Sequence, residues 1–175
     1  MADQDPINPT PEGNDEGQAA LPQAATIAQY IKDFSAESPS TPQVFQWQGQ
    51  PTLDVQFGIN GTKVGHDVQE VVLKIDVTAK SDNGTHFIID LSYGGLFAFR
   101  NFPEDALAPF LLVEAPRLLF PFARQIIAET VQNLGFPPVL LDPIDFAAAY
   151  VAQVEAQQAA QGQPGGNGEP PVGHA

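Results

Sequence analysis

Residues 71–93 read VVLKIDVTAKSDNGTHFIIDLSY, and this stretch determines the fold that we expect. On each side of the central Asn83-Gly84, apolar side chains occupy every second position. Such alternation is typical of a β-strand with one buried face, and Asn-Gly favours the tight turn of a β-hairpin. The stretch therefore predicts two antiparallel strands. Their shared apolar face is expected to hold Val71, Leu73, Ile75, Val77, Phe87, Ile89, Leu91 and Tyr93.

Two more strands are expected before this hairpin. Residues 53–59 alternate clearly, and residues 28–37 alternate more weakly, with a proline-flanked connection at 38–45 between them. Asn60-Gly61 predicts a second tight turn. Both Asn-Gly pairs are also formal glycosylation sequons, but the turn interpretation is preferred because nothing in the sequence indicates secretion. The result is an antiparallel, meander-like sheet of four strands.

Helices are expected after about residue 103. Residues 117–134 place apolar side chains at spacings of three and four, which is typical of an amphipathic helix, and Gly135 is a natural C-terminal stop. Pro121 removes a backbone hydrogen bond if it lies beyond the first turn, so the regular helix is expected to begin there. Asp145 predicts the N-cap of a second helix. Strands followed by helices predict an α+β domain with the helices on one side of the sheet.

Both ends of the chain are expected to be disordered. Residues 1–25 are rich in Pro, Gly, Asp and Gln and contain no Lys or Arg, and residues 159–175 are rich in Gly and Gln. Segments of this composition bury too little apolar surface to offset the entropy cost of ordering. One folded domain is therefore predicted at 26–158, between an acidic N-terminal extension and a polar tail.

The charge and the missing cysteine exclude several classes of protein. A net charge of -14, from 21 acidic and 7 basic residues, repels nucleic acid and anionic membranes and favours a basic partner. The absence of Cys removes disulfides, thiolate metal sites and thiol nucleophiles. The N-terminus has no signal-peptide pattern. The longest apolar stretch, 110–122, is interrupted by prolines and charges, so no membrane insertion is expected and a cytoplasmic protein is predicted.

The residues do not predict an enzyme, a metal site or a cofactor site. His86 and Asp90 lie four apart on one strand face, so about 13 Å separates them at about 3.3 Å per residue. His66 is the other histidine of the predicted domain, and His174 is in the tail. Glu104-Asp105 is interpreted as the acidic start of a helix and not as a catalytic pair. No Gly-rich phosphate loop or serine elbow is present.

Surface chemistry remains as the source of function. The chain has 12 Phe, and a small sheet with two helices has more apolar faces than one monomer can cover. Excess apolar surface indicates oligomerisation, apolar ligands or both. Acidic residues on a strand face usually mark solvent. Ile88 beside Asp90, however, combines an apolar anchor with an acidic neighbour, a pattern that can dock a basic peptide.

Five blocks of sequence, in this order and spacing, resemble the SecB family of protein-export chaperones. They are residues 33–45 (DFSAESPSTPQVF), 67–73 (DVQEVVL), 93–97 (YGGLF), 119–124 (LFPFAR) and 137–146 (PPVLLDPIDF). The resemblance covers about 26–158. It implies a homotetramer, built as a dimer of dimers, that holds unfolded secretory precursors without ATP and delivers them to the SecA motor. It also implies that the metal belongs to the basic zinc-binding tail of SecA and not to this chain.

The resemblance also assigns roles to individual residues. It implies that SecA docks on Asp33, Glu37, Ile88 and Asp90. It implies that the client groove contains Val44, Phe45, Leu53, Val55 and Phe57. It links Ile89, Leu91 and Tyr93 to subunit packing.

One residue departs from the family pattern, and two other functions stay open. Trp47 lies two residues before Gly49, the position at which the family places a tryptophan, so the lining of the groove near it is undecided. The first alternative function is a SecB-like chaperone dedicated to one client, such as an antitoxin. The second is an α+β protein that encloses a small apolar ligand.

Overall fold

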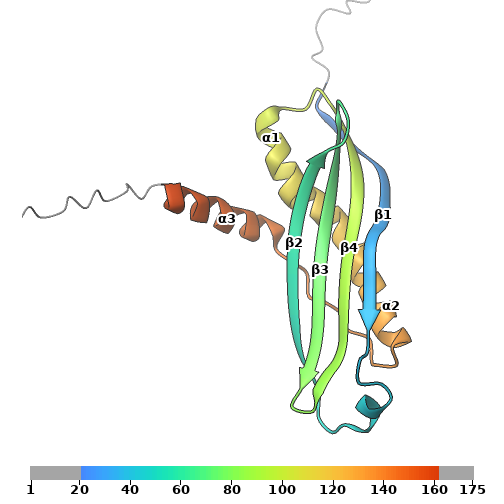
Figure 1. The fold of residues 1–175 in the computed structure, drawn as a ribbon. Helices are drawn as coiled ribbons and strands as arrows, with labels where there is room; N and C mark the ends of the chain where they lie inside the picture. Colours follow the sequence, from blue (N-terminus) through green and yellow to red (C-terminus); the bar gives the residue numbers. More distant parts are fainter. Residues whose placement is uncertain (1–20, 162–175) are drawn as a thin grey trace, which may run out of the picture.

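The computed structural model describes residues 21–161 and consists of one antiparallel sheet with helices on one face (Figure 1). The strands are β1 (Gln23–Glu37), β2 (Thr52–Lys63), β3 (Val68–Ser81) and β4 (Gly84–Arg100). The predicted four-stranded antiparallel sheet is confirmed. Most of the predicted terminal segments, 1–25 and 159–175, lies outside the described residues. In the described residues, β1 begins at Gln23, before the predicted boundary at 26, and the last helix ends at Gln161, after the predicted boundary at 158.

The strand order is β1-β4-β3-β2, so the expected meander is only partly correct. Strands β2, β3 and β4 follow one another, but β1 pairs with β4 and not with β2. The connection between β1 and β2 must therefore pass from one edge of the sheet to the other, about 14 Å at the usual strand spacing. Residues 38–51, which include the short helix η1 (Gln43–Gln46), make this connection. The result is a Greek key.

The two turns predicted at Asn-Gly pairs have different outcomes. The predicted hairpin at Asn83-Gly84 is confirmed: Ser81 pairs with Gly84, which has a φ of 138°. The predicted turn at Asn60-Gly61 is wrong, because both residues lie inside β2 and pair with Val72 and Val71. The chain reverses at 64–67 instead, where the Val64 N–H donates to the Val68 carbonyl at 3.0 Å. Continuing β2 through Asn60-Gly61 keeps ladder hydrogen bonds that an earlier turn would lose.

The first helix begins earlier than the periodicity predicted. Helix α1 (Glu104–Pro109), a π-helical turn η2 (Phe110–Glu114) and α2 (Ala115–Asn133) follow without a break. We call this continuous segment, Glu104–Asn133, the helical rod. Pro121 lies inside α2, so the expectation that the regular helix begins there is wrong. The end of the rod is as predicted. Gly135, with φ 92°, and Phe136 donate to carbonyls of the last turn in a Schellman motif.

The helical rod is also the one helix among the described residues that is long and apolar enough to cross a bilayer, with a mean hydropathy of 1.4 over a window of 18 residues. The prediction that prolines and charges interrupt the apolar stretch 110–122 is therefore wrong, because the helix continues through these residues. In the structure the rod lies along the sheet, and its buried face supplies Leu119, Ala123, Ile127 and Val131 to the core. Packing on the sheet accounts for these apolar residues.

The core lies between α2 and the two central strands. The apolar face predicted for the hairpin is confirmed: its eight side chains are at most 8% exposed. Gly94 and Gly95 let other groups approach β4 from its two sides. A Cβ on Gly94 would lie 2.8 Å from the ring of Tyr30, and one on Gly95 would lie 2.8 Å from Leu119 of α2.

Helix α3 (Phe146–Gln161) leaves the body of the molecule beside β2 and points away from the sheet (Figure 1). The predicted cap is confirmed, because the Ala148 N–H donates to Asp145 Oδ1 at 3.0 Å. Phe146 is 1% exposed and anchors the helix, whereas Val151 is 52% exposed. Only the first turns of α3 therefore contribute to the core.

Candidate functional site

Strand β2 carries an apolar face that the helical rod does not cover. Leu53, Val55 and Phe57 point to the same side of the sheet as the core, since they pair with Ala79, Val77 and Ile75. Their β3 partners are fully buried, but the three β2 side chains remain about 40% exposed. The α2 part of the rod packs on β3 and β4, and η2 reaches β2 near Gly61 through Leu111, so the stretch of β2 that carries these three side chains stays open. The uncovered surface is the strongest candidate for apolar recognition in the described part of the chain.

A first pocket of about 470 Å³ lies at the start of β2. We call it the Trp47 pocket. Its walls come from four parts of the chain: helix η1 with Trp47, the segment that leads into β2, the start of β4 and the segment that follows α2. Ring centroids are 5.5 Å apart for Phe45 and Phe136, and 5.1 Å apart for Trp47 and His86. The lining is Val44, Phe45, Trp47, Gly49, Gln50, Pro51, Leu53, His86, Phe87 and residues 135–139.

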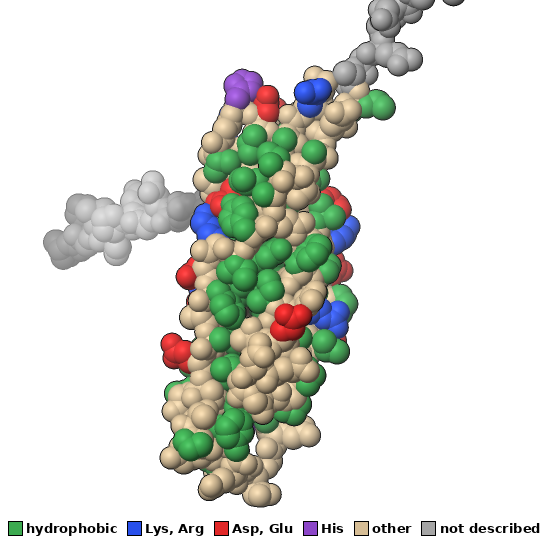
Figure 2. Space-filling view, turned by 90° about the vertical axis from the view of Figure 1, so that its right-hand side faces the viewer, with side chains coloured by type: hydrophobic (Ala, Val, Ile, Leu, Met, Phe, Trp, Pro, Cys, Tyr) green, Lys and Arg blue, Asp and Glu red, His purple; other side chains and the backbone are tan. Residues whose placement is uncertain are grey.

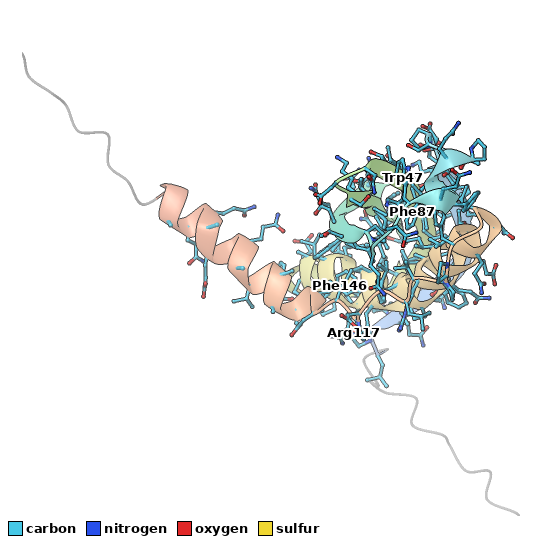
Figure 3. The ribbon with its side chains drawn as sticks, turned by 90° about the horizontal axis from the view of Figure 1, so that it is seen from below. Trp47, Phe87, Arg117 and Phe146 are labelled. Atoms are coloured by element: carbon cyan, nitrogen blue, oxygen red, sulfur yellow. The ribbon has the colours of Figure 1, made fainter. Side chains whose placement is uncertain are left out.

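A second pocket of about 450 Å³ continues along β2 and is lined by Val55, Phe57 and residues 141–145. We call it the Phe57 pocket. Phe57 makes an edge-to-face contact with Phe146, with centroids 5.8 Å apart. Leu53 of the Trp47 pocket and Val55 of this one are about 7 Å apart on one strand face. The two pockets thus follow one strand, and we call them together the β2 groove. Figure 3 shows Trp47 and Phe87 against the sheet and Phe146 where α3 leaves it.

The five predicted client-binding residues all line the β2 groove. Phe45 is 53% exposed and offers its ring to a ligand, whereas Val44 is 3% exposed and supports the wall from below. The structure also decides the position of Trp47, whose ring lies 3.1 Å from where a Cβ on Gly84 would be. Trp47 therefore lines the pocket from its displaced position. That these residues bind clients stays a prediction.

Sequence reasoning missed one wall of the groove. Residues 135–145 follow α2, and Phe136, Leu141 and Ile144 from this segment line the two pockets. A signal was present: apolar residues and prolines alternate there without helical or strand periodicity. Such a pattern after a helix indicates an extended segment that packs on a neighbour. It could not show which strand the segment covers.

The predicted SecA-docking residues come together on the opposite face of the sheet. In the register, Glu37 is opposite Ile88, Ser35 is opposite Asp90 and Asp33 is opposite Ser92. The four residues thus occupy adjacent strands, β1 and β4, and we call this surface the acidic face. Ile88 is 39% exposed, and Asp33 and Glu37 are exposed. Acidic groups around an exposed apolar side chain complement a basic partner with an apolar contact.

Asp90 is not free on this face. The Lys74 ammonium lies 3.0 Å from Asp90 Oδ2 and 3.5 Å from Asp76 Oδ1. The hydrogen bond to Asp90 and the two carboxylate charges raise the pKa of Lys74. The second oxygen of Asp90, Oδ1, is buried and has no hydrogen-bond partner among the described residues.

A second polar cluster on this side of the sheet centres on Glu70. The Tyr30 hydroxyl donates to Glu70 Oε1 at 2.5 Å, and the Lys32 ammonium donates to Oε2 at 2.6 Å. These hydrogen bonds, the one from Lys32 first, lower the pKa of Glu70. The same contact raises the pKa of Tyr30 to about 12. Because Tyr30 belongs to β1 and Glu70 to β3, the cluster fastens the edge strand to the sheet.

The residues predicted for subunit packing lie in the core of the single chain. Ile89 and Leu91 are fully buried, and Tyr93 is 8% exposed, on the face that α2 covers. In the single chain, Ile89 and Leu91 therefore expose no surface of their own and support the face on which α2 packs. That the three residues influence subunit packing stays a prediction.

The histidines and acidic pairs outside these surfaces do not converge. Among residues 21–161, no group of three or more His, Asp or Glu side chains is placed to hold a metal ion. His66 forms its ion pair with its neighbour Asp67, with Nδ1 2.8 Å from Oδ1. Glu104 and Asp105 lie in the first turn of α1, as their interpretation as a helix start predicted. His86 is 5% exposed among aromatic rings, with Nε2 2.9 Å from Ser81 Oγ.

An open apolar groove along an edge strand, backed by an acidic sheet face, is a surface typical of proteins that bind polypeptide segments. Residues 17–157 match the family model of SecB, described as preprotein translocase subunit SecB, and the chain belongs to this family. SecB proteins are chaperones and not enzymes.

Curated relatives match all or most of the chain. A protein-export protein SecB of Sphingopyxis alaskensis is 52% identical over 178 residues and covers 100% of both chains. A second, from Zymomonas mobilis, is 54% identical over 137 residues, 78% of this chain and 84% of its own. A SecB-like chaperone of Mycobacterium tuberculosis, solved in complex with a ChAD peptide from the HigA1 antitoxin, has a TM-score of 0.59. It is 16% identical, covers 69% of this chain and 90% of its own, and therefore shows the fold alone.

Proposed function

We propose that this protein is an ATP-independent holdase that binds unfolded secretory precursors in the cytoplasm, keeps them competent for translocation and delivers them to the SecA motor. The observation that carries the proposal is the open β2 groove on a chain of the SecB family. An unfolded precursor exposes aromatic and aliphatic side chains, which such a groove can shield from aggregation.

Binding without nucleotide is supported by the form of the groove. Leu53, Val55 and Phe57 are already about 40% exposed in the single chain, so no energy-consuming step is needed to open the groove. Each groove is short and each contact is weak. Several grooves on one homotetramer, a dimer of dimers, would bind one long client with high avidity.

Exposed apolar residues outside the β2 groove support this assembly. Ile27, Ile31 and Phe34 of β1 are between 39% and 56% exposed, and Leu118 and Phe122 of α2 are close to 50% exposed. Figure 2 views the molecule from the β1 side and shows apolar side chains gathered along its length. A second copy that covered these residues would stabilise a dimer.

Delivery would use the acidic face. Asp33, Glu37 and Asp90 with Ile88 lie on the side of the sheet opposite the helices, so client and motor could bind together. The expected partner is the basic, zinc-binding tail of SecA, which contributes the metal itself. The net charge of -14 would also speed the encounter with a basic surface.

The groove assignment is tested with two serine substitutions on one strand. Leu53→Ser and Phe57→Ser together remove two apolar contacts and should weaken binding of a denatured precursor at least tenfold. Gln56→Ser, on the other face of β2, is the control and should leave affinity unchanged. Binding is measured by co-elution of freshly diluted precursor, without nucleotide. The proposal would be overturned if the double serine variant bound the denatured precursor as tightly as Gln56→Ser does. It would also be overturned if the unmodified chaperone co-eluted with the folded mature form of the precursor.

One alternative has an observation in its favour. The structural neighbour from Mycobacterium tuberculosis was solved with an antitoxin peptide, so a chaperone dedicated to one client is the second candidate. A panel of unrelated denatured proteins separates the two, because a dedicated chaperone binds only its own client. The enclosed small-molecule site is less well supported, since the groove is lined by exposed side chains.

A further inference from the structure

A lysine of the neighbouring strand β3 borders the acidic face on the same side of the sheet. Lys74 of β3 lies between Asp90 of β4 and Asp76 of its own strand, with its ammonium 3.0 Å and 3.5 Å from their carboxylates. Asp90 is one of the groups proposed above to receive a basic partner. In the free protein, the chain's own cation therefore already occupies the position at which a partner's cation would bind.

We propose that Lys74 acts as an internal competitor for the basic partner and must leave Asp90 before the partner's cation can bind there. This inference rests on the proposed function of the acidic face and goes beyond it. It assigns Lys74 the role of a specificity-determining residue: only a segment with a cation that reaches Asp90 can displace it. A weakly basic surface cannot.

The geometry of the pair shows why the exchange is possible. The side chains of Lys74 and Asp90 are 49% and 36% exposed, and ion pairs with this exposure are weak. The pair also uses only one carboxylate oxygen, because Asp90 Oδ1 has no partner among residues 21–161. A buried acceptor without a hydrogen bond is unfavourable, so the resting pair is incomplete. A partner cation therefore competes with a weak ion pair that leaves one oxygen of Asp90 without a hydrogen bond.

Proton loss does not open the site. The neighbouring carboxylates raise the pKa of Lys74, with the hydrogen bond to Asp90 as the main cause, so the ammonium stays charged near neutral pH. The ion pair must therefore be broken by exchange of one cation for another. Salt weakens both the resting pair and the partner contact.

Four full-length variants test the proposal: Lys74→Gln, Lys80→Gln, Asp90→Asn and the double variant Lys74→Gln/Asp90→Asn. Lys80 is the matched control, because it is exposed, lies on the same face of β3 and has no ion-pair partner among the described residues. It is about 20 Å from Lys74. Both lysine substitutions change the net charge equally. Two probes are used: purified SecA, and a hexaarginine peptide followed through the NMR signal of the Ile88 methyl group.

The expected result is a gain of affinity that depends on both residues. Lys74→Gln should bind each probe about two- to fivefold more tightly at low salt, and Lys80→Gln should give a clearly smaller change. In the Asp90→Asn background, the Lys74 substitution should give no more gain than Lys80→Gln gives, because a double-mutant cycle removes the part that is specific to the pair.

The two probes separate failure of this inference from failure of the proposed function. If no protein binds SecA while hexaarginine shows the gain specific to Lys74, SecA delivery is wrong and the competitor role stands. If Lys74→Gln and Lys80→Gln change hexaarginine binding equally, or if the gain survives Asp90→Asn, the competitor role is overturned, whatever SecA does.

Discussion

At the residue scale, the Glu70 carboxylate joins β1 and β3, two strands that are not neighbours in the sheet. Tyr30 reaches it from β1 and Lys32 from the same strand, across β4. The path is open because position 94 is a glycine: any Cβ there would come within 2.8 Å of the Tyr30 ring. The edge strand of the sheet is thus held by side chains as well as by its backbone ladder.

We expect Glu70→Gln to lower the free energy of unfolding by about 1–2 kcal/mol at neutral pH, because it weakens two charge-assisted or short hydrogen bonds. The pKa of Glu70 is lowered from 4.5 by its partners. Its contribution is therefore present above pH 4.5 and is lost as pH falls through the lowered pKa. Urea unfolding at fixed protein concentration, repeated at decreasing pH, should show wild type and variant converging.

The matched control for this prediction is Glu129→Gln, an exposed carboxylate on α2 that accepts a hydrogen bond from Gln125. It should change stability little at any pH. Tyr30 gives stability the opposite pH dependence, because its pKa is raised to about 12. Its contribution to stability is complete below pH 10 and is lost as pH rises through 12. A difference between wild type and Glu70→Gln that stays constant through acid would contradict the proposed role of this carboxylate.

At the element scale, the distance between α2 and the sheet is set at Gly95. Its missing side chain leaves room for Leu119, which is fully buried against β4. The helix can therefore approach the central strands closely while the edge strand β2 stays uncovered. The β2 groove is a consequence of this placement.

Gly95→Ala is expected to destabilise the protein by about 1–3 kcal/mol, the usual result of overpacking a filled core. A Cβ there would lie 2.8 Å from Leu119 and 2.9 Å from Phe97. Gly58→Ala is the control, because nothing lies within 4 Å of its added Cβ, and it should be neutral or slightly stabilising. Thermal unfolding of both variants measures the difference. Equal melting temperatures would show that α2 does not rest on this glycine.

At the scale of the whole molecule, the finished monomer still exposes apolar side chains on several elements. Leu118 and Phe122 lie one turn apart on α2 and are 48% and 49% exposed. Their surface lies outside the β2 groove and differs from the acidic face. We assign it to contacts between copies in the proposed tetramer.

Leu118→Asp/Phe122→Asp should therefore shift the protein to a smaller oligomer, because two charges would be buried without partners at the contact. Size-exclusion chromatography with light scattering gives the mass directly. Val64→Asp, an equally exposed position at the β2–β3 turn, should leave the mass unchanged. An unaltered mass for the α2 variant would move the proposed contact elsewhere.

Local patterns predicted much of the fold. The alternation at 71–93 identified the buried face of the central hairpin, and Asp145 identified the cap of α3. The same local reasoning failed at Asn60-Gly61 and at Pro121. There, pairing with β3 and packing on the sheet outweigh an intrinsic preference for a turn or a helix break. For the candidate site, the sequence named five residues of the groove but missed its wall at 135–145.

The sequence by itself determined what depends on neighbours along the chain: strand periodicity, caps, the central hairpin, net charge and the blocks that mark the family. The tertiary structure decided what depends on distant parts of the chain. It placed β1 beside β4, left β2 uncovered, buried Ile89 and Leu91 within one subunit, and paired Lys74 with Asp90. The physical reason is that the periodicity of a segment fixes the face on which each side chain lies. Its burial and its partners depend on which other element packs against that face.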